Sequence, residues 1–291
     1  MNRDMNLQHY KMANRIYIVL LISVLLLSAC ANRGMGPQGG PKDTIPPKMV
    51  KEVPVSGSLN VQPKKLEITF DEYIQLADIQ NNVLISPPQQ TPPEIKAVGK
   101  TLSVVFQEDL QDSTTYTIDF GAAICDYNEK VPLEGYVFAF STGDHIDSLA
   151  ISGRVYNAEN LNPVSAVLVG IHSNLNDTAL STLPFARVTR SNSEGYFTIH
   201  NIRKSDYKLY ALNDISRDYI YQPGEGLAFQ DSIYTPYAVN HTHLDTIWQD
   251  TIGIDSVTLD TLFTRVVDTI HVHTTTQYLP DSLVIWYFEE A

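Results

Sequence analysis

Two pairs of histidines have the spacing that could bind a transition metal. The repeated spacing belongs to two short segments, His241-Thr-His243 and His271-Val-His273. Residues two apart on a β-strand lie on the same face, so each pair could chelate one metal ion. If the pairs met, with Asp245 or Asp268 nearby, the four imidazoles would form a zinc site. The alternative is that alternating His, Thr and Val are simply solvent-facing residues of a β-ribbon.

A cysteine near the N-terminus carries the second candidate chemistry, which is acylation of its thiol. Cys30 follows Leu27-Ser28-Ala29 and an apolar run over residues 16–27, which is preceded by Lys11 and Arg15. A transmembrane helix needs about 20 apolar residues, so this run is too short to span a bilayer. A basic segment, a short apolar segment and small residues before a cleavage point are typical of a signal peptide.

The segment Leu27-Ser28-Ala29-Cys30 resembles the lipobox of bacterial lipoproteins. The resemblance implies that residues 1–29 are removed, that the Cys30 thiol receives a diacylglyceryl group, and that its new amine is acylated with a chain such as palmitate. Each buried methylene contributes about 0.8 kcal/mol, so several acyl chains would anchor the protein almost permanently. The alternative is an ordinary cleaved signal that happens to end in cysteine.

Charge limits the possible partners. The chain has a formal net charge of −13 at pH 7, and its basic leader precedes Cys30. No basic patch therefore remains to neutralise phosphates, which excludes nucleic acid. The acidic surface also repels anionic headgroups, so acylated Cys30 would be the contact with the membrane. The residue after Cys30 is Ala31 and not Asp, a pattern that resembles that of lipoproteins sorted to the outer membrane. No acidic cluster follows Cys30, which favours the periplasmic face over the cell surface.

The other residues do not form a catalytic or calcium-binding pattern. The sequence lacks a Gly-x-Ser-x-Gly elbow, a His-Glu-x-x-His motif, a Gly-rich phosphate loop and the Asp-x-Asp-x-Asp-Gly spacing of a calcium loop. Asp71 and Glu72 are adjacent, so on a strand they point to opposite faces and cannot flank one sugar. Cys125 follows an apolar stretch and is expected to be a buried hydrophobe, with no cysteine left for a disulfide. We therefore expect no enzyme activity and no cofactor.

The elements expected to carry these residues begin with a Gly/Pro-rich tether, residues 30–47, which cannot bury a core. Residues 48–143 follow as short strands separated by turn residues, a pattern typical of a β-sandwich. The strand-like segments are Leu66–Phe70, Leu102–Phe106, Thr115–Phe120 and Tyr136–Ser141. The region resembles the bacterial Ig-like family of S-layer proteins through Ile45-Pro46-Pro47, Ile68–Tyr73, Leu110–Ile118 and Phe138–Gly143. The resemblance implies a spacer or binding domain without catalytic residues.

Residues 148–238 are predicted to form a second β unit. Its clearest local signal predicts a β-hairpin, in which the turn Asn192-Ser-Glu-Gly195 joins two alternating runs, because glycine accepts positive φ at little cost. The order Gly153-Arg-Val155, Pro163-Val164, Glu194-Gly-Tyr-Phe197 and Tyr207-Lys-Leu-Tyr-Ala211 resembles the carboxypeptidase regulatory-like domain. That resemblance implies a transthyretin-like, non-catalytic sandwich of the kind found beside outer-membrane receptors in Bacteroidetes-type bacteria.

Residues 239–291 form a tail in which Asp-hydroxyl-aliphatic triplets recur every five residues. The triplets begin at Asp245, Asp250, Asp255 and Asp260, and another begins at Asp268. An odd period sends successive triplets to opposite faces of an extended chain, which excludes one amphipathic strand. Short strands joined by Asx turns, or an extended ribbon packed on a neighbour, fit better. Residues 282–288 read as a final strand that either begins a truncated further domain or completes a sheet already present.

The sequence therefore predicts an all-β protein with two tandem sandwiches, Ig-like and then transthyretin-like, behind a lipoprotein signal peptide. We expect a non-enzymatic, membrane-anchored envelope lipoprotein that acts as a structural or interaction module with an envelope protein or glycan partner. One alternative is a glycan-binding surface lipoprotein, which requires coplanar exposed Tyr or Trp residues on one sheet face. A second alternative is metal binding through the histidine pairs His241/His243 and His271/His273.

Overall fold

The computed structural model describes residues 14–22, 42–254, 257–258 and 261–289. The chain divides into two units, Met1–Asp43 and Thr44–Ala291. In the first unit, residues 14–22 form a helix whose apolar side chains are exposed. No helix in the described part of the chain is long and apolar enough to cross a membrane. Cys30 lies outside the described residues, so its lipidation stays a prediction.

The second unit begins with a first domain that encloses a core between two sheets. One sheet has the order β1 (Met49–Val53), β2 (Lys65–Phe70), β6 (Thr101–Val105), β5 (Glu94–Val98). The other has the order β4 (Leu84–Ser86), β7 (Thr115–Asp119), β9 (Val137–Ser141). A strand pair, β3 (Ile74–Leu76) and β8 (Ile124–Asp126), and the short helix α2 (Ile79–Asn82) complete the domain.

The alternation in the sequence explains why these strands form. On β2, Leu66, Ile68 and Phe70 are fully buried while the residues between them face outward, as their two-residue period predicts. Leu102 and Val104 do the same on β6, the partner strand. The strands expected within residues 66–70, 102–106, 115–120 and 136–141 are all present. The all-β prediction is thereby confirmed in this domain.

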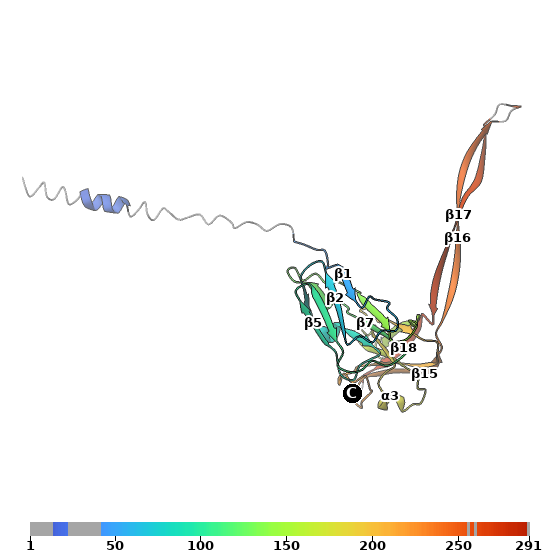
Figure 1. Ribbon diagram of the computed structural model, residues 1–291, viewed down its shortest axis with the longest axis horizontal. Helices are drawn as coiled ribbons and strands as arrows, with labels where there is room; N and C mark the ends of the chain where they lie inside the picture. Colours follow the sequence, from blue (N-terminus) through green and yellow to red (C-terminus); the bar gives the residue numbers. More distant parts are fainter. Residues whose placement is uncertain (1–13, 23–41, 255–256, 259–260, 290–291) are drawn as a thin grey trace, which may run out of the picture. The chain divides into compact units, whose positions relative to one another are not determined.

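The second domain is a single seven-stranded sheet that curves into a near-barrel (Figure 1). Its strands are β12 (Arg187–Arg190), β11 (Leu168–His172), β14 (Tyr207–Leu212), β15 (Leu227–Tyr234), β18 (Leu283–Phe288), β10 (Leu149–Asn157) and β13 (Tyr196–Ile202), in that spatial order. The short helix α3 (Ala179–Thr182) lies between β11 and β12 in the chain. The end strands β12 and β13 contact each other and are joined by the predicted turn, in which Gly195 has a φ of 73°. The predicted hairpin is wrong, however, because β12 pairs with β11 and β13 pairs with β10.

The last strand of the chain is part of this sheet. β18 lies between β15 and β10 and runs parallel to β10, with Gly153 paired to Leu283 and Val155 paired to Ile285. Ile285 is fully buried and belongs to the domain core. Residues 282–288 were predicted either to begin a further domain or to complete a sheet already present. The structure shows the second alternative. The transthyretin-like identity of the second domain stays a prediction.

Between β15 and β18 the chain forms a long two-stranded ribbon. β16 (Tyr237–Ile254) pairs with β17 (Thr261–Leu279) in an antiparallel ladder, and Figure 1 shows the pair leaving the sheets of the two domains. The five-residue period does place Ile247 and Ile252 on opposite faces, but one continuous strand carries both. An extended ribbon is therefore present, but the exclusion of a single continuous strand is wrong, and short strands joined by Asx turns do not occur within residues 237–254. Residues 241–252 are all exposed, so the expected packing on a neighbour is not seen there.

Candidate functional site

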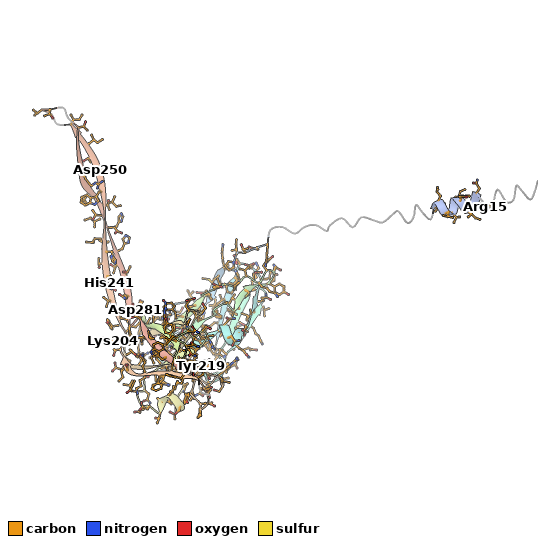
Figure 2. The ribbon with its side chains drawn as sticks, turned by 180° about the vertical axis from the view of Figure 1, so that it is seen from behind. Arg15, Lys204, Tyr219, His241, Asp250 and Asp281 are labelled. Atoms are coloured by element: carbon orange, nitrogen blue, oxygen red, sulfur yellow. The ribbon has the colours of Figure 1, made fainter. Side chains whose placement is uncertain are left out.

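The ladder register of the ribbon brings the predicted histidines together. His243 on β16 is directly opposite His273 on β17, and Asp245 is directly opposite His271. His241 lies two residues before His243 on β16 and is opposite Thr275. Paired residues and residues two apart share a face, so all four histidines and Asp245 lie on one face of the ribbon. We call this set the histidine face. Figure 2 shows His241 and Asp250 at two points along the ribbon.

The side chains of the histidine face are exposed and close to one another. The His273 Nε2 atom lies 3.6 Å from an Asp245 carboxylate oxygen. The rings of His271 and His273 are stacked with their centroids 6.2 Å apart. His241 is instead engaged by Gln277, whose side-chain oxygen is 3.0 Å from Nε2. Asp268, the other carboxylate that the sequence placed nearby, falls at a bulge in the ladder beyond Ile247.

The opposite face of the ribbon is apolar. Leu244 pairs with Val272, Trp248 pairs with Val267, and these pairs alternate with the residues of the histidine face. The apolar face consists of six large side chains that are 48% to 66% exposed: Leu244, Trp248, Ile252, Val267, Ile270 and Val272. Large contiguous apolar patches on a soluble surface mark interaction sites. In the described structure each strand of the ribbon pairs only with the other, and these six side chains remain exposed.

A buried polar network joins the two domains, and sequence reasoning missed it. Asp147, between β9 and β10, is 5% exposed and lies 3.7 Å from guanidinium nitrogens of both Arg187 and Arg203. The backbone nitrogen of Asp147 donates to the Thr115 hydroxyl, 2.9 Å away, and that hydroxyl is 3.2 Å from the Asp147 carboxylate. Arg187 donates to the carbonyl oxygen of Thr115 in the first domain. Nothing in the local sequence of β12 indicates that Arg187 contacts Asp147 and Thr115, which are 40 or more residues away.

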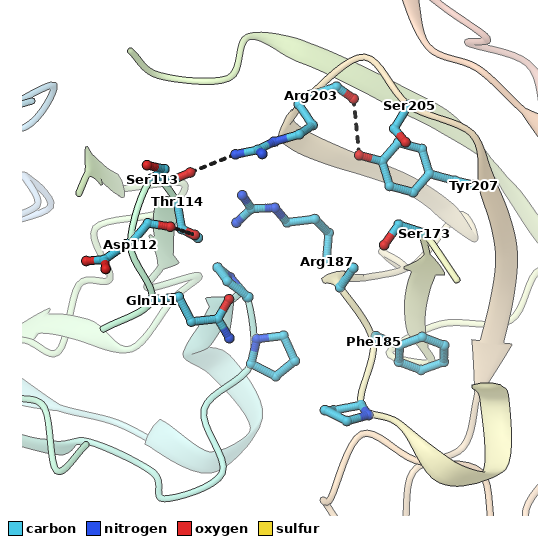
Figure 3. Close-up of a pocket in the computed structure, with 14 residues that line it drawn as sticks. Gln111, Asp112, Ser113, Thr114, Ser173, Phe185, Arg187, Arg203, Ser205 and Tyr207 are labelled. Atoms are coloured by element: carbon cyan, nitrogen blue, oxygen red, sulfur yellow. Dashed lines mark hydrogen bonds between the residues drawn. The ribbon is translucent and has the colours of Figure 1, made fainter. Parts of the chain in front are cut away.

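A cleft of about 490 Å³ lies beside this network, and Figure 3 shows its lining. Arg187 and Arg203 come from the second domain, while Gln111 and Thr114 come from the first. Arg203 donates to the Ser113 carbonyl oxygen at 2.7 Å. Burial lowers the pKa of Arg187 to about 10, with Asp147 acting in the opposite direction. Hydroxyl groups line the cleft, and no histidine or cysteine is among its described lining residues.

The outer face of the second sheet carries an exposed aromatic group. Tyr156 is paired with Trp286, and their rings lie 5.8 Å apart at an angle of 35°. The Arg154 guanidinium lies 3.6 Å from the centre of the Tyr196 ring and donates to the Tyr156 hydroxyl at 2.8 Å. Trp286 is 41% exposed and Tyr196 is 46% exposed. These aromatic residues share one face, as the glycan alternative requires, but the 35° tilt between Tyr156 and Trp286 departs from the coplanar arrangement that it also requires.

The single remaining cysteine is placed as its apolar surroundings predict. Cys125 lies on β8 and is 5% exposed. Burial raises the pKa of its thiol, and the neighbouring Asp126 carboxylate raises it further. A thiol held in its protonated form is a poor nucleophile. Asp71, by contrast, binds the start of the first domain, because its carboxylate accepts the Lys48 backbone N–H at 2.8 Å.

Comparison with known proteins identifies part of the chain. Residues 43–142 match the family model described as bacterial Ig-like domain. Among curated proteins, none matches the sequence. The N-terminal part of the bacterial S-layer protein SbsC is 16% identical, with a TM-score of 0.24 and coverage of 57% of this chain and 40% of that one. The T6 backbone pilin of Streptococcus pyogenes is 10% identical, with a TM-score of 0.25 and coverage of 89% and 76%.

An L,D-transpeptidase from Mycobacterium smegmatis has a similarly low TM-score of 0.24, with 10% identity and coverage of 79% of this chain and 77% of that one. Similarities at this level carry no argument about activity. The family model agrees with the two-sheet core of β1 to β9 and with the resemblance seen in the sequence. The chain therefore contains a bacterial Ig-like domain at residues 43–142, followed by a second, near-barrel β domain.

Proposed function

We propose that this protein is a non-enzymatic, lipid-anchored module of the bacterial envelope, and that the ribbon is its binding element. The lipobox Leu27-Ser28-Ala29-Cys30 and the Gly/Pro-rich tether support the anchor. The Ig-like domain supports a place in the envelope, where such modules act as spacers and binding domains. The outer membrane is the proposed location, with the periplasmic face favoured because no acidic cluster follows Cys30.

The apolar face of the ribbon is the observation that carries this proposal. An isolated two-stranded ribbon is marginally stable in water, and a third strand or a packed layer normally supports it. Here two strands of 18 and 19 residues expose Trp248, Leu244 and Val272 on one side. Burying such side chains stabilises a complex by about 25 cal/mol for each Å² of apolar surface removed from water. A ribbon of this length is therefore most stable with a partner.

A protein partner suits this face better than a lipid bilayer. Asp250 and Arg265 form an ion pair with a 2.9 Å separation on the same face as Trp248 and Ile252. This ion pair lies within the apolar face, between Trp248 and Ile252, and charged side chains are costly to place in the hydrocarbon of a bilayer. The chain is also acidic overall, which repels the anionic headgroups of a membrane surface. An envelope protein with a complementary apolar surface is the proposed partner.

Site-specific photocrosslinking in cells tests the proposal. A photoreactive residue at Leu244, on the apolar face, is expected to crosslink to a discrete envelope protein. The same residue at Thr275, on the histidine face, serves as the matched control because both positions are exposed and lie in the ribbon. Crosslinking from Leu244 alone supports the proposal. Equal labelling from both positions, or none from Leu244, contradicts it.

Glycan binding is a second candidate, supported by the aromatic group on the second sheet. Tyr156, Tyr196 and Trp286 share a face with the Arg154 guanidinium, which provides apolar ring surfaces beside a hydrogen-bond donor. A glycan array measured with the native chain and a Trp286→Ala variant separates this candidate from the first. Array binding that disappears in the variant supports it, whereas no binding at millimolar glycan removes it.

A further inference from the structure

We propose that the histidine face of the ribbon binds a divalent transition metal such as zinc, with His243, His273, Asp245 and His271 as its ligands. This site lies on the face opposite the apolar face, so it does not rest on the proposed partner. Imidazole nitrogens suit zinc, copper and nickel, whereas calcium and magnesium prefer oxygen ligands. Three imidazoles and one carboxylate form a ligand set of the kind that zinc accepts.

The pairing of β16 with β17 determines where the Cβ atoms of these four side chains lie. His243 and His273 are directly opposite, as are Asp245 and His271. Directly opposite Cβ atoms in an antiparallel pair are about 5 Å apart, and residues two apart along a strand share the same face. The four side chains therefore begin at the corners of one small rectangle across the two strands. The pairing of the two strands therefore brings three imidazoles and one carboxylate to one patch of the ribbon.

The distances between the donor groups are close to those of a metal site. Zinc–nitrogen bonds of about 2.0 Å in a tetrahedral arrangement put two ligand atoms about 3.3 Å apart. The His273 Nε2 atom and the Asp245 carboxylate oxygen are separated by 3.6 Å. The His271 and His273 ring centroids, at 6.2 Å, must approach by about 1 Å to bind one ion. All four side chains are exposed, so they can rotate.

Within the described residues, no three such donors converge on one point as the side chains are placed. Metal binding would bring the donor groups of these side chains together, because on a fixed backbone the side chains need only rotate about χ1 and χ2. The exposed position leaves room for a water molecule as a further ligand.

His241 lies outside this ligand set, although it belongs to the same face. Its ring is held by Gln277, which in turn donates to Asp281 at 2.6 Å. His241 is opposite Thr275, which supplies no strong metal donor. His241 therefore provides a matched control, because its removal deletes one exposed imidazole from the same face without removing a proposed ligand.

Metal binding would join β16 to β17 and stabilise the ribbon. Each strand contributes ligands, so opening the ladder between His243 and His273 would break metal–ligand bonds. A ligand that binds only the closed form stabilises it by RT ln(1 + [L]/Kd). At a zinc concentration 100 times Kd, the open form becomes about 100-fold rarer. Amide hydrogen exchange in the ribbon should slow by the same factor.

Calorimetric titration of the full chain with zinc chloride tests the assignment. One zinc per chain is expected, with at least a 10-fold weaker affinity in His243→Ala and in His273→Ala and an unchanged affinity in His241→Ala. The assignment is overturned if the native chain does not bind zinc at 100 µM, if the double variant H243A/H273A binds as tightly as the native chain, or if His241→Ala weakens binding as much as His243→Ala does.

Hydrogen exchange on the native chain gives a second test that does not depend on any variant. Zinc is expected to slow exchange of the amides near His243 and His273 and to leave the Ig-like domain unchanged. Zinc binding that leaves ribbon exchange unaltered would place the metal elsewhere and overturn the assignment. A negative result here would not affect the apolar face, whose crosslinking is measured without added metal.

Discussion

Arg187 of the second domain donates a hydrogen bond from Nη1 to the backbone carbonyl oxygen of Thr115 in the Ig-like domain. Both residues are buried, and Asp147 between the domains completes the contact through the Thr115 hydroxyl and the Arg187 guanidinium. A charged, satisfied network of this kind requires one arrangement of its members. The two domains therefore meet through fixed contacts and not through a free hinge at residues 143–148.

The network predicts a large effect from removing its acid. Asp147→Ala would leave the buried Arg187 without the carboxylate 3.7 Å away, which should lower the free energy of unfolding by about 3 kcal/mol. Urea unfolding measures the loss. Glu94→Ala is the control, since Glu94 pairs with Lys96 on the surface and its removal should cost under about 1 kcal/mol. Equal losses in the two variants would show that the Asp147 network contributes little.

His172 predicts how stability depends on pH. Burial lowers its pKa from 6.5 to about 4, and its Nε2 atom has no hydrogen-bond partner within the described residues. As pH falls below 6.5, the unfolded chain binds a proton that the folded chain cannot, so stability falls until about pH 4. The full loss from this residue is about 3 kcal/mol.

The variant His172→Phe removes the imidazole that binds this proton in the unfolded chain, while it keeps an aromatic ring beside Phe185 and Tyr210. Urea unfolding at pH 8, 6 and 4.5 should show a steeper loss of stability in the native chain than in the variant. Above pH 7 the imidazole is neutral in both states, so its titration should contribute no difference there. Parallel pH curves for the two chains would contradict the assignment.

The position of β18 predicts the result of shortening its core side chain. Ile285 is fully buried between β10 and β15, so Ile285→Ala should destabilise the protein by about 3 kcal/mol. Val284, its neighbour, is 36% exposed on the outer face, and Val284→Ala should cost much less. Thermal or urea unfolding distinguishes the two. If β18 were a separate segment outside the sheet, both variants would unfold like the native chain.

Local pattern was enough to predict several elements of this fold. The alternation of Leu66, Ile68 and Phe70 predicted β2, because a strand with one buried face must alternate. The Asn192–Gly195 turn was visible for a similar reason, since its glycine takes the positive φ that the turn requires. In both cases the local structure is determined by interactions among residues that are close in the sequence.

Contacts between distant residues could not be predicted in this way. The pairing of Leu283 with Gly153 joins residues 130 positions apart, and no local pattern in either strand specifies the other. The histidine spacing gave two chelating pairs, but only the register of β16 against β17 places His243 opposite His273. The Arg187–Thr115 contact depends likewise on how two independently folded sheets meet.

The proposed lipidation of Cys30 predicts where the protein is found in the cell. Cys30→Ser removes the thiol of the proposed lipobox, so the variant should keep an uncleaved leader or leave the lipid-anchored fraction. Cys125→Ser is the matched control, because Cys125 is buried and should not affect anchoring. Detergent partitioning and mass spectrometry of the N-terminal peptide measure both. An unmodified Cys30 in the native protein would remove the anchor.

Shortening the ribbon tests the central claim most directly. His241 and Thr275 are register partners, so replacing residues 242–274 with Asn-Gly closes the hairpin with a two-residue turn and keeps β18 in its sheet. The full chain and the shortened chain are then compared on native gels of solubilised envelopes and in urea unfolding. We predict that the full chain migrates in a larger complex, while the shortened chain migrates alone with equal domain stability. Equal complex formation by both chains would contradict the ribbon as the binding element.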